Sequence, residues 1–113
     1  MKSKIIALSK NEDFKSLLKQ KKISNKYTTI FFGKIANKNR SKLNISFVTK
    51  KKIGKAVKRN KIKRRLRNIV NDAVKNITLK FEYSYLVIAK PTMLNKEYTI
   101  IKETLFRDLE RIR

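Results

Sequence analysis

The sequence predicts an α+β fold, in which a small mixed sheet packs against helices in the order α-β-β-(β)-α-β-α. Three observations support this prediction. The chain has 113 residues, 41% of them hydrophobic, which is enough for one modest core and a single domain over residues 1–113. Two segments have the character of strands, one rich in aromatic and β-branched residues and one that alternates between apolar and polar residues. A later segment repeats its apolar residues with the period of a helix.

The first predicted element is a short helix over about residues 10–19. Ser9 and Glu12 have the spacing of a capping box, and Asn11 is an alternative cap. The apolar side of this helix would carry Phe14, Leu17 and Leu18. The polar, basic residues that follow, 19–26, predict a turn with room for one short strand.

The next two predicted elements are strands over residues 27–35 and 43–50, joined by a polar turn. The first strand is rich in aromatic and β-branched residues, and it would place Ile30 and Phe32 on one face and Phe31 on the other. In the second strand, alternation separates Leu43, Ile45, Phe47 and Thr49 from Asn44, Ser46 and Val48. Because the two strands follow each other directly, we expect them to pair as a hairpin.

The longest predicted element is a helix from Lys55 or Ala56 to Asn76. Its apolar residues follow a period of 3.6 and comprise Ile62, Leu66, Ile69, Val70, Ala73 and Ile77. We expect this stripe to face the sheet and to form the largest part of the core.

The last two elements are an apolar strand over residues 84–90, ended by Pro91, and a final helix. Asn95 is expected to cap that helix. Its apolar stripe would consist of Tyr98, Ile101, Leu105, Leu109 and Ile112.

Positive charge dominates the composition. The chain has 31 Lys and Arg against 8 Asp and Glu, a formal net charge of +23. An AT-rich genome can raise the lysine content of any surface, but it does not explain how the charges are distributed. Between Phe14 and Asn71 there are 20 basic residues and no acidic one. Such a charge favours binding to a polyanion, either nucleic acid or an anionic membrane.

Several other functions are disfavoured by composition. No apolar run is long enough to span a bilayer, and the N-terminal apolar segment is too short for a signal peptide, so we expect no membrane partner and a cytoplasmic location. The chain has no cysteine and no histidine, which removes thiolate metal sites and the commonest general base. The eight carboxylates are scattered. We therefore expect neither a catalytic residue nor a metal site in the protein itself.

The basic residues of the long helix are organised by face. At 100° per residue, one polar flank beside the apolar stripe holds Asn60, Lys63, Arg64 and Arg67, with Arg59 at its edge in the first turn. The remaining basic residues Lys58, Lys61 and Arg65 point elsewhere. Like charges four residues apart destabilise a helix by about 0.2–0.5 kcal/mol per pair. Binding to a phosphate backbone would turn this unfavourable repulsion into a favourable interaction. Arginine binds phosphate in bidentate fashion, so the flank favours nucleic acid over a merely solvated face.

Four blocks of the sequence together carry a family resemblance. KKIGKAVKRNKIKRRLR (51–67) resembles the signature of the bacterial ribonuclease P protein subunit, whose core is an Arg-Asn pair followed by Lys-Arg and a further Arg. NEDF (11–14) resembles that family's first helix, VTKK (48–51) precedes the signature as it does in the family, and LVIAKP (86–91) resembles its last strand. The likeness covers nearly the whole chain, and the order of the four blocks makes it specific.

The resemblance implies both a fold and a mechanism. The implied fold is similar to domain 2 of ribosomal protein S5, in which the basic helix joins two parallel strands by a left-handed crossover, against the usual right-handed rule. The implied activity is that of an endoribonuclease whose catalyst is a large RNA. That RNA removes the 5′ leader of precursor tRNA with Mg²⁺ bound mainly by the RNA. The protein would bind the ribonuclease P RNA and the precursor tRNA.

The resemblance also implies site residues. Carried over by position, contacts to the catalytic RNA would come from Lys51, Lys52, Arg59, Asn60, Lys63, Arg64 and Arg67. A cleft between the sheet and the first helix would bind the single-stranded leader through Phe14, Leu18 and Phe32. Leu18 stands where the family often has a second aromatic, and Lys90 where arginine is common. Composition alone would equally fit a ribosomal protein or a general RNA-binding chaperone, and only the motif blocks separate these alternatives.

Overall fold

A computed structural model describes residues 5–8, 10–35 and 42–112. Its elements are β1 (Ile5–Ile6), α1 (Asn11–Leu18), β2 (Lys21–Ser24), β3 (Thr28–Gly33), β4 (Leu43–Val48), the 3₁₀ turn η1 (Lys51–Ile53), α2 (Ala56–Asn76), β5 (Ser84–Ala89), the 3₁₀ turn η2 (Pro91–Asn95) and α3 (Tyr98–Arg111). The predicted α+β class is confirmed. The predicted optional strand is β2, whereas β1 was not predicted.

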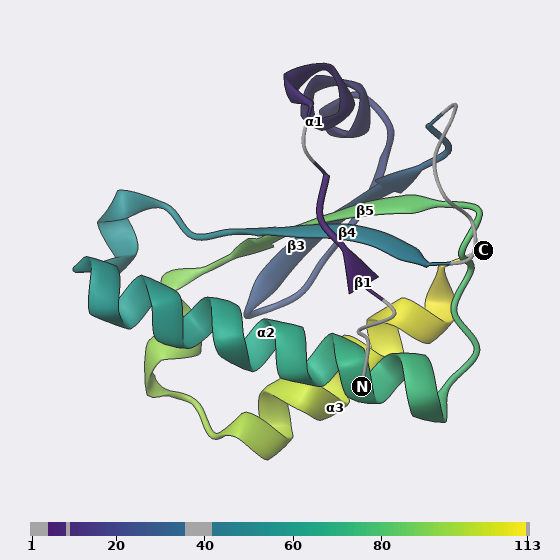
Figure 1. The fold of residues 1–113 in the computed structure, drawn as a ribbon. Helices are drawn as coiled ribbons and strands as arrows, with labels where there is room; N and C mark the ends of the chain where they lie inside the picture. Colours follow the sequence, from purple (N-terminus) through teal and green to yellow (C-terminus); the bar gives the residue numbers. More distant parts are fainter. Residues whose placement is uncertain (1–4, 9, 36–41, 113) are drawn as a thin grey trace.

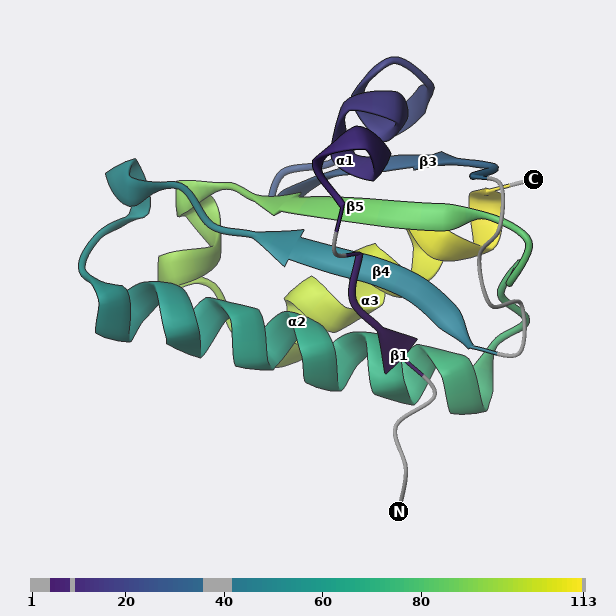
Figure 2. The same ribbon diagram turned by 45° about the horizontal axis from the view of Figure 1, so that its top comes forward.

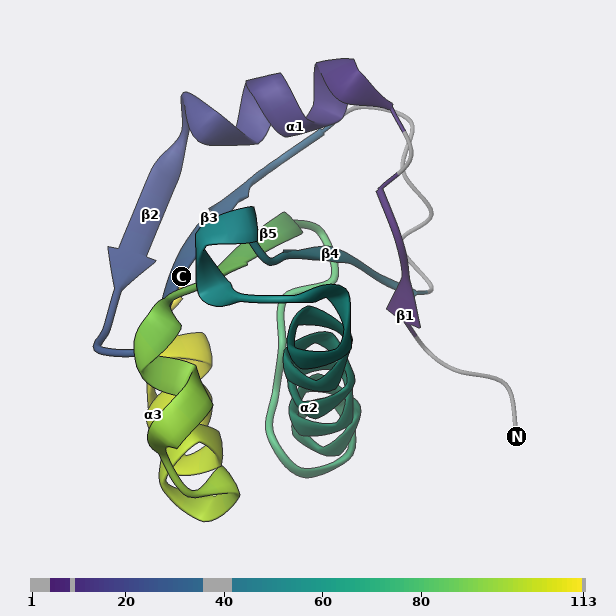
Figure 3. The same ribbon diagram turned by 90° about the vertical axis from the view of Figure 1, so that its left-hand side faces the viewer.

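The five strands form one mixed sheet in the order β1-β4-β5-β3-β2. Helices α2 and α3 lie side by side under one face, and α1 lies across the other (Figures 1 and 3). The central strands β4 and β5 run parallel and are joined through α2. This connection passes beneath the sheet and is left-handed, as the resemblance implied and against the general preference (Figures 1 and 2).

The main core lies between the sheet and the pair of helices α2 and α3. Ile62, Leu66, Ile69, Val70 and Ala73 of α2 are all at most 1% exposed, and they pack with Ile30, Ile45 and Tyr85 of the sheet. The predicted stripe of α3 also lies in this core. The 3.6-residue period of the sequence therefore assigned the buried residues of the two helices correctly. The alternation of β4 assigned the two faces of the strand, but Asn44 and Ser46, which it set opposite the apolar residues, are also buried.

The expected hairpin between residues 27–35 and 43–50 is wrong. Strand β3 pairs with β5 on one side and β2 on the other, and β4 pairs with β5 and β1. The nearly continuous apolar run of β5 is typical of a strand buried on both faces, as expected in the middle of a sheet. Strand β5 takes this central place between β4 and β3, so the two predicted hairpin strands are separated by it.

The expected helix caps are also wrong where the structure describes them. Helix α1 begins at Asn11 after Lys10, so Asn11 is its first residue and not its cap, and Ser9 lies outside the described residues. Asn95 does not cap the last helix, because Pro91–Asn95 forms η2 and α3 begins after Glu97. Proline is favoured at the first position of a helical turn, which lets this turn start directly after β5.

Tyr85 links the start of β5 to the segment before it. Its side chain is 1% exposed, and its hydroxyl donates a hydrogen bond to the carbonyl oxygen of Lys80 at 2.7 Å. Burial raises the pKa of this phenol above its ordinary value. The folded protein therefore keeps the phenol neutral at pH values where the unfolded chain ionises it.

We expect Tyr85→Phe to be less stable than the wild type by about 1 kcal/mol at pH 8, because it lacks this hydrogen bond. Above about pH 10 the unfolded wild type binds fewer protons than the folded one, so the stability advantage of the wild type should shrink as pH rises. Urea unfolding of both proteins between pH 8 and 11 measures the difference. Parallel stability curves would contradict the burial effect.

The α1 side of the sheet is only partly covered. An eight-residue helix is about 12 Å long, whereas a six-residue strand spans about 20 Å. A small cluster forms there, with Leu8, Leu17 and Leu86 buried. Around it lie apolar residues that stay partly exposed, which we call the α1-side patch: Phe14, Phe31, Ile35, Val48 and Ile88.

No helix in the described part of the chain combines the length and the hydropathy required to cross a membrane.

Candidate nucleic-acid interface

A groove of about 430 Å³ runs along the outer edge of β4, and we call it the β4 groove. Strand β1 pairs only with Leu43 and Asn44, so the rest of this edge faces the groove and not another described strand. The walls come from three elements, with Phe14 on α1, Ser46 to Val48 on β4, and Lys63 with Arg67 on α2. The groove therefore connects the α1 side of the sheet with the basic helix.

Ser46 holds the N-terminal segment against this edge. Its hydroxyl accepts a hydrogen bond from the backbone N–H of Leu8 at 2.8 Å. Ile5 and Ala7, on the same segment, line the β4 groove. Figure 2 shows this segment running from the α2 side of the sheet toward α1, the helix that carries the groove residue Phe14.

The structure brings together three of the predicted site residues from different elements. Lys63 and Arg67 are one helical turn apart on α2 and share the β4 groove with Phe14. The family resemblance implied two separate roles for these residues, contact with the catalytic RNA and contact with the leader. In the structure they line one continuous surface.

The other predicted residues of α2 lie on the same helix but do not line this groove. Asn60 and Arg64 are exposed, and Arg64 lies on the side of the helix opposite the core stripe. Arg59 is half-buried, and its Nε is a buried donor that has no hydrogen-bond acceptor among the described residues. A buried donor without a partner is costly, so this guanidinium is suited to receive an anionic ligand.

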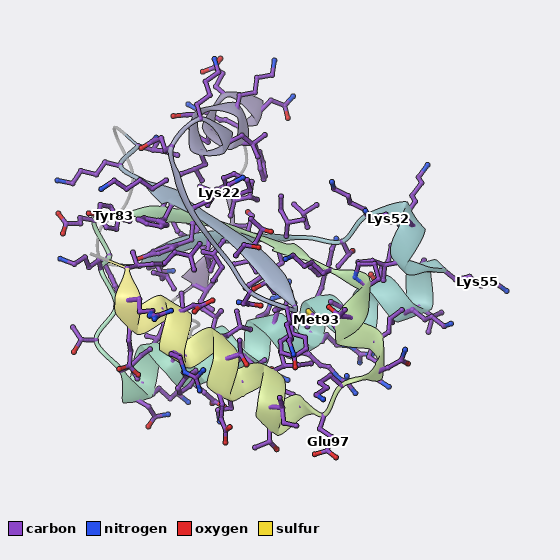
Figure 4. All side chains as sticks on the ribbon, turned by 180° about the vertical axis from the view of Figure 1, so that it is seen from behind. Lys22, Lys52, Lys55, Tyr83, Met93 and Glu97 are labelled. Carbon is purple, nitrogen blue, oxygen red and sulfur yellow. The ribbon has the colours of Figure 1, made fainter. Side chains whose placement is uncertain are left out.

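Lys51 and Lys52 extend the positive surface beyond the start of α2. Both are exposed in η1, and Figure 4 shows Lys52 and Lys55 pointing outward at this end of the molecule. Gly54 makes the turn from η1 into α2 with a φ of 143°, a conformation that other residues rarely adopt. This turn keeps the two lysines close to the first turn of the helix.

The predicted leader residues do not all lie together. Leu18 is 50% exposed and lies one helical turn after Phe14, so it can extend the same side of α1. Phe32 is 6% exposed and belongs to the main core, where its ring centroid lies 5.7 Å from that of Tyr83. The structure therefore does not place Phe32 in a cleft with Phe14.

Phe31 is the aromatic of β3 that lies on the α1 side. It is half-buried in the cluster that contains Phe14, and Lys22 Nζ lies 6.0 Å from its ring centroid. Figure 4 shows Lys22 on this side of the sheet. The alternation of β3 placed Phe31 and Phe32 on opposite faces correctly. It could not show which face α1 covers.

Lys90 has a structural role at the turn between β2 and β3. Its ammonium donates to Ser24 Oγ at 2.8 Å and to the carbonyl oxygen of Asn25 at 2.6 Å. Asn25 in turn donates to the buried carboxylate of Asp108 on α3 at 2.8 Å. The residue after β5 therefore ties β2, β3 and α3 together, away from the β4 groove.

Comparison with known proteins identifies the relatives of this chain. A family model described as Ribonuclease P matches residues 3–113. The Ribonuclease P protein component of Carboxydothermus hydrogenoformans is 33% identical over 102 residues, covering 87% of this chain and 83% of the relative. The component from Mycoplasma mycoides is 27% identical over the full length of both chains.

Solved structures give a similar result. The RNase P protein from Thermotoga maritima superposes with a TM-score of 0.80 at 26% identity, covering 96% of this chain and 98% of that one. The Staphylococcus aureus RNase P protein shares the fold, with a TM-score of 0.76 at 23% identity over 93% of this chain and 92% of that one.

Proposed function

This chain belongs to the ribonuclease P protein family, and from that premise we propose that it is the protein subunit of a ribonuclease P holoenzyme. In this proposal the chain binds the catalytic RNA and the 5′ leader of precursor tRNA in the cytoplasm. The RNA performs the hydrolysis that releases the leader. The protein contributes binding and positioning.

The observation that carries this proposal is the continuity between the α1-side patch and the β4 groove. Phe14 and Val48 belong to both. A single RNA strand needs apolar surface for its bases and positive charge for its phosphates. The α1-side patch offers apolar surface for the bases at Phe14, Phe31 and Val48. Where this patch meets α2, Lys63 and Arg67 offer positive charge for the phosphates.

The polar flank of α2 would bind the catalytic RNA next to this groove. Arg64 and Asn60 are exposed there, and the unpaired Nε of Arg59 would gain a phosphate oxygen as its acceptor. The two RNAs would then meet at Lys63 and Arg67. Such a meeting point would hold the leader close to the catalytic centre of the RNA.

We assign the Mg²⁺ of the reaction to the RNA. In the part of the chain that the structure describes, no group of three or more Asp or Glu side chains could hold a metal ion. We therefore derive no chemical step from a metal held by the protein. The role of the protein is to neutralise phosphates, which lowers the Mg²⁺ concentration that the RNA requires to fold and bind substrate.

Cleavage of a precursor tRNA by a bacterial ribonuclease P RNA at low Mg²⁺, with and without this protein, tests the proposal. We expect stimulation only when RNA and protein are both present. Cleavage by the protein alone would overturn the division of roles. A wild-type protein that neither binds nor stimulates the RNA would overturn the function and favour a general RNA-binding protein.

A further inference from the structure

A second basic groove lies on the other flank of α2, and we call it the η2 groove. It has a volume of about 300 Å³ between α2 and η2. Its walls carry Lys58, Lys61 and Arg65 from α2, and Leu94 with Asn95 from η2. These three basic residues are the ones that the sequence placed away from the predicted RNA-binding flank.

The two grooves lie on nearly opposite sides of one helix. At 100° per residue, the direction of Lys58, Lys61 and Arg65 differs by about 170° from that of Lys63 and Arg67. The β4 groove lies at the edge of β4 beside β1, and the η2 groove lies between α2 and η2. An RNA segment bound in the β4 groove therefore does not also contact the η2 groove.

The charges of the η2 groove have no acidic partner among the described residues. The ion pairs described in the structure are Lys34 with Glu82, Lys80 with Glu82, and Lys102 with Asp72. Asp72 lies further along the same flank, where Lys102 of α3 binds it at 2.9 Å. Glu97, the acidic residue nearest in sequence to Asn95, points away from the body of the molecule in Figure 4.

The positive surface continues past η2. A neighbouring hollow of about 360 Å³ is lined by Lys26, Tyr27, Thr92, Asn95 and Lys96, and it shares Asn95 with the η2 groove. The backbone here is well fixed, because Lys90 N–H donates to the carbonyl oxygen of Tyr27 at 2.8 Å and Thr92 donates to that of Lys26. Five cations thus follow one rigid strip.

A strip of this kind fits a chain of phosphates better than a single anion. The η2 groove carries three cations beside the apolar residues Ile62 and Leu94, the neighbouring hollow carries two more, and Asn95 lines both. Repulsion among the three α2 residues destabilises the free helix, and a polyphosphate backbone would reverse that effect. Lysine and arginine contacts to phosphate fix position without reading sequence.

We propose that the η2 groove binds a second backbone segment of the catalytic RNA, so that α2 is held between two RNA segments. This inference rests on the proposed function, since it assumes that the RNA partner is the ribonuclease P RNA. It assigns Lys58, Lys61 and Arg65 to assembly with the RNA and gives them no part in leader binding.

The test measures the affinity of the full-length protein for a bacterial ribonuclease P RNA across a series of KCl concentrations. The variant is K58Q/K61Q/R65Q, and the matched control K75Q/R107Q/R111Q removes the same charge from exposed positions at the far end of α2 and on α3. Circular dichroism and urea unfolding verify that both variants fold. We expect the η2-groove variant to lose about three phosphate contacts, which lowers the slope of log K against log salt by about 2–3.

The expected loss of affinity at 0.2 M KCl is about 10- to 100-fold for the η2-groove variant and less than about threefold for the control. Preference of the assembled complex for leader-bearing over mature tRNA should stay at the wild-type value. Equal losses of affinity in both variants, or a folded η2-groove variant with the wild-type slope, would overturn the proposal that the η2 groove binds a second RNA segment. Either result would leave the proposed function intact. A wild-type protein without affinity for the RNA would overturn both.

A second measurement locates the segment. The chain has no cysteine, so single cysteines at Ala7 in the β4 groove and at Asn95 in the η2 groove can each carry a tethered RNA-cleaving probe. We expect A7C and N95C to cut different segments of the catalytic RNA. Identical cleavage patterns, or no cleavage from N95C in a complex that A7C cleaves, would overturn the proposal.

Discussion

The double substitution K63Q/R67Q should weaken both assembly with the catalytic RNA and recognition of the leader. Both side chains line the β4 groove, where they lie beside Phe14. A charged hydrogen bond to phosphate contributes about 1.5 kcal/mol at the lower end of its usual range, so losing two contacts corresponds to about 100-fold in affinity. The dissociation constant of the protein for ribonuclease P RNA, measured at fixed salt, gives this loss directly.

The leader contribution is measured on the assembled holoenzyme, as the ratio of affinities for leader-bearing and mature tRNA. We expect K63Q/R67Q to reduce this ratio, and we expect R64Q to weaken assembly without changing it, because Arg64 lies on the exposed side of α2 away from the groove. K75Q/R107Q is the charge-matched control. A ratio that falls equally in R64Q and K63Q/R67Q would show that the groove has no special role in leader binding.

Local periodicity predicted which residues of the long helix are buried. The stripe of α2 from Ile62 to Ala73 was correct, because burial of a helix face is set by the spacing of apolar residues. In β4 the alternation separated the two faces of the strand but not their burial, because Asn44 and Ser46 are buried on the face opposite Leu43 and Ile45. The same spacing says nothing about which element covers a face. For that reason the spacing separated Phe31 from Phe32 but did not indicate that Phe31 is the one in the cluster with Phe14; the expectation of Phe32 there came from the resemblance.

Strand partners and crossover handedness could not be predicted from local pattern. Pairing β3 with β5 joins residues 28–33 to residues 84–89, more than fifty positions apart. The left-handed path from β4 through α2 to β5 runs against the general preference, and only the family resemblance indicated it. The β4 groove depends on both features, since they leave the edge of β4 next to the polar flank of α2.

The basic residues of α2 illustrate the same limit. The helical wheel placed Lys63 and Arg67 on one flank and Lys58, Lys61 and Arg65 on another. It could not show that η2 would lie against the second flank and turn it into a groove. From the sequence alone, such a flank is indistinguishable from a charged surface exposed to solvent. It becomes a candidate binding site only when a second element, distant in the chain, forms the other wall of a groove.

Leucine substitutions at Phe31 and Phe32 should separate leader binding from folding. Phe32 is 6% exposed in the main core, and full truncation to alanine there should lower the free energy of unfolding by about 3–5 kcal/mol. F32L keeps most of the volume and should cost less than about 1.5 kcal/mol while leaving RNA binding unchanged. Urea unfolding measures both values.

F31L should have the opposite profile. Phe31 is half-buried in the α1-side patch, so leucine fills its place in the cluster at little cost in stability, but it removes the aromatic face on which a base would stack. Base stacking on an aromatic contributes about 1–3 kcal/mol, which predicts a loss of about 5- to 150-fold in the affinity of the holoenzyme for leader-bearing tRNA. Affinity for mature tRNA should be unchanged. If F32L, rather than F31L, reduced leader affinity in a normally folded protein, the leader would have to bind outside the α1 side of the sheet.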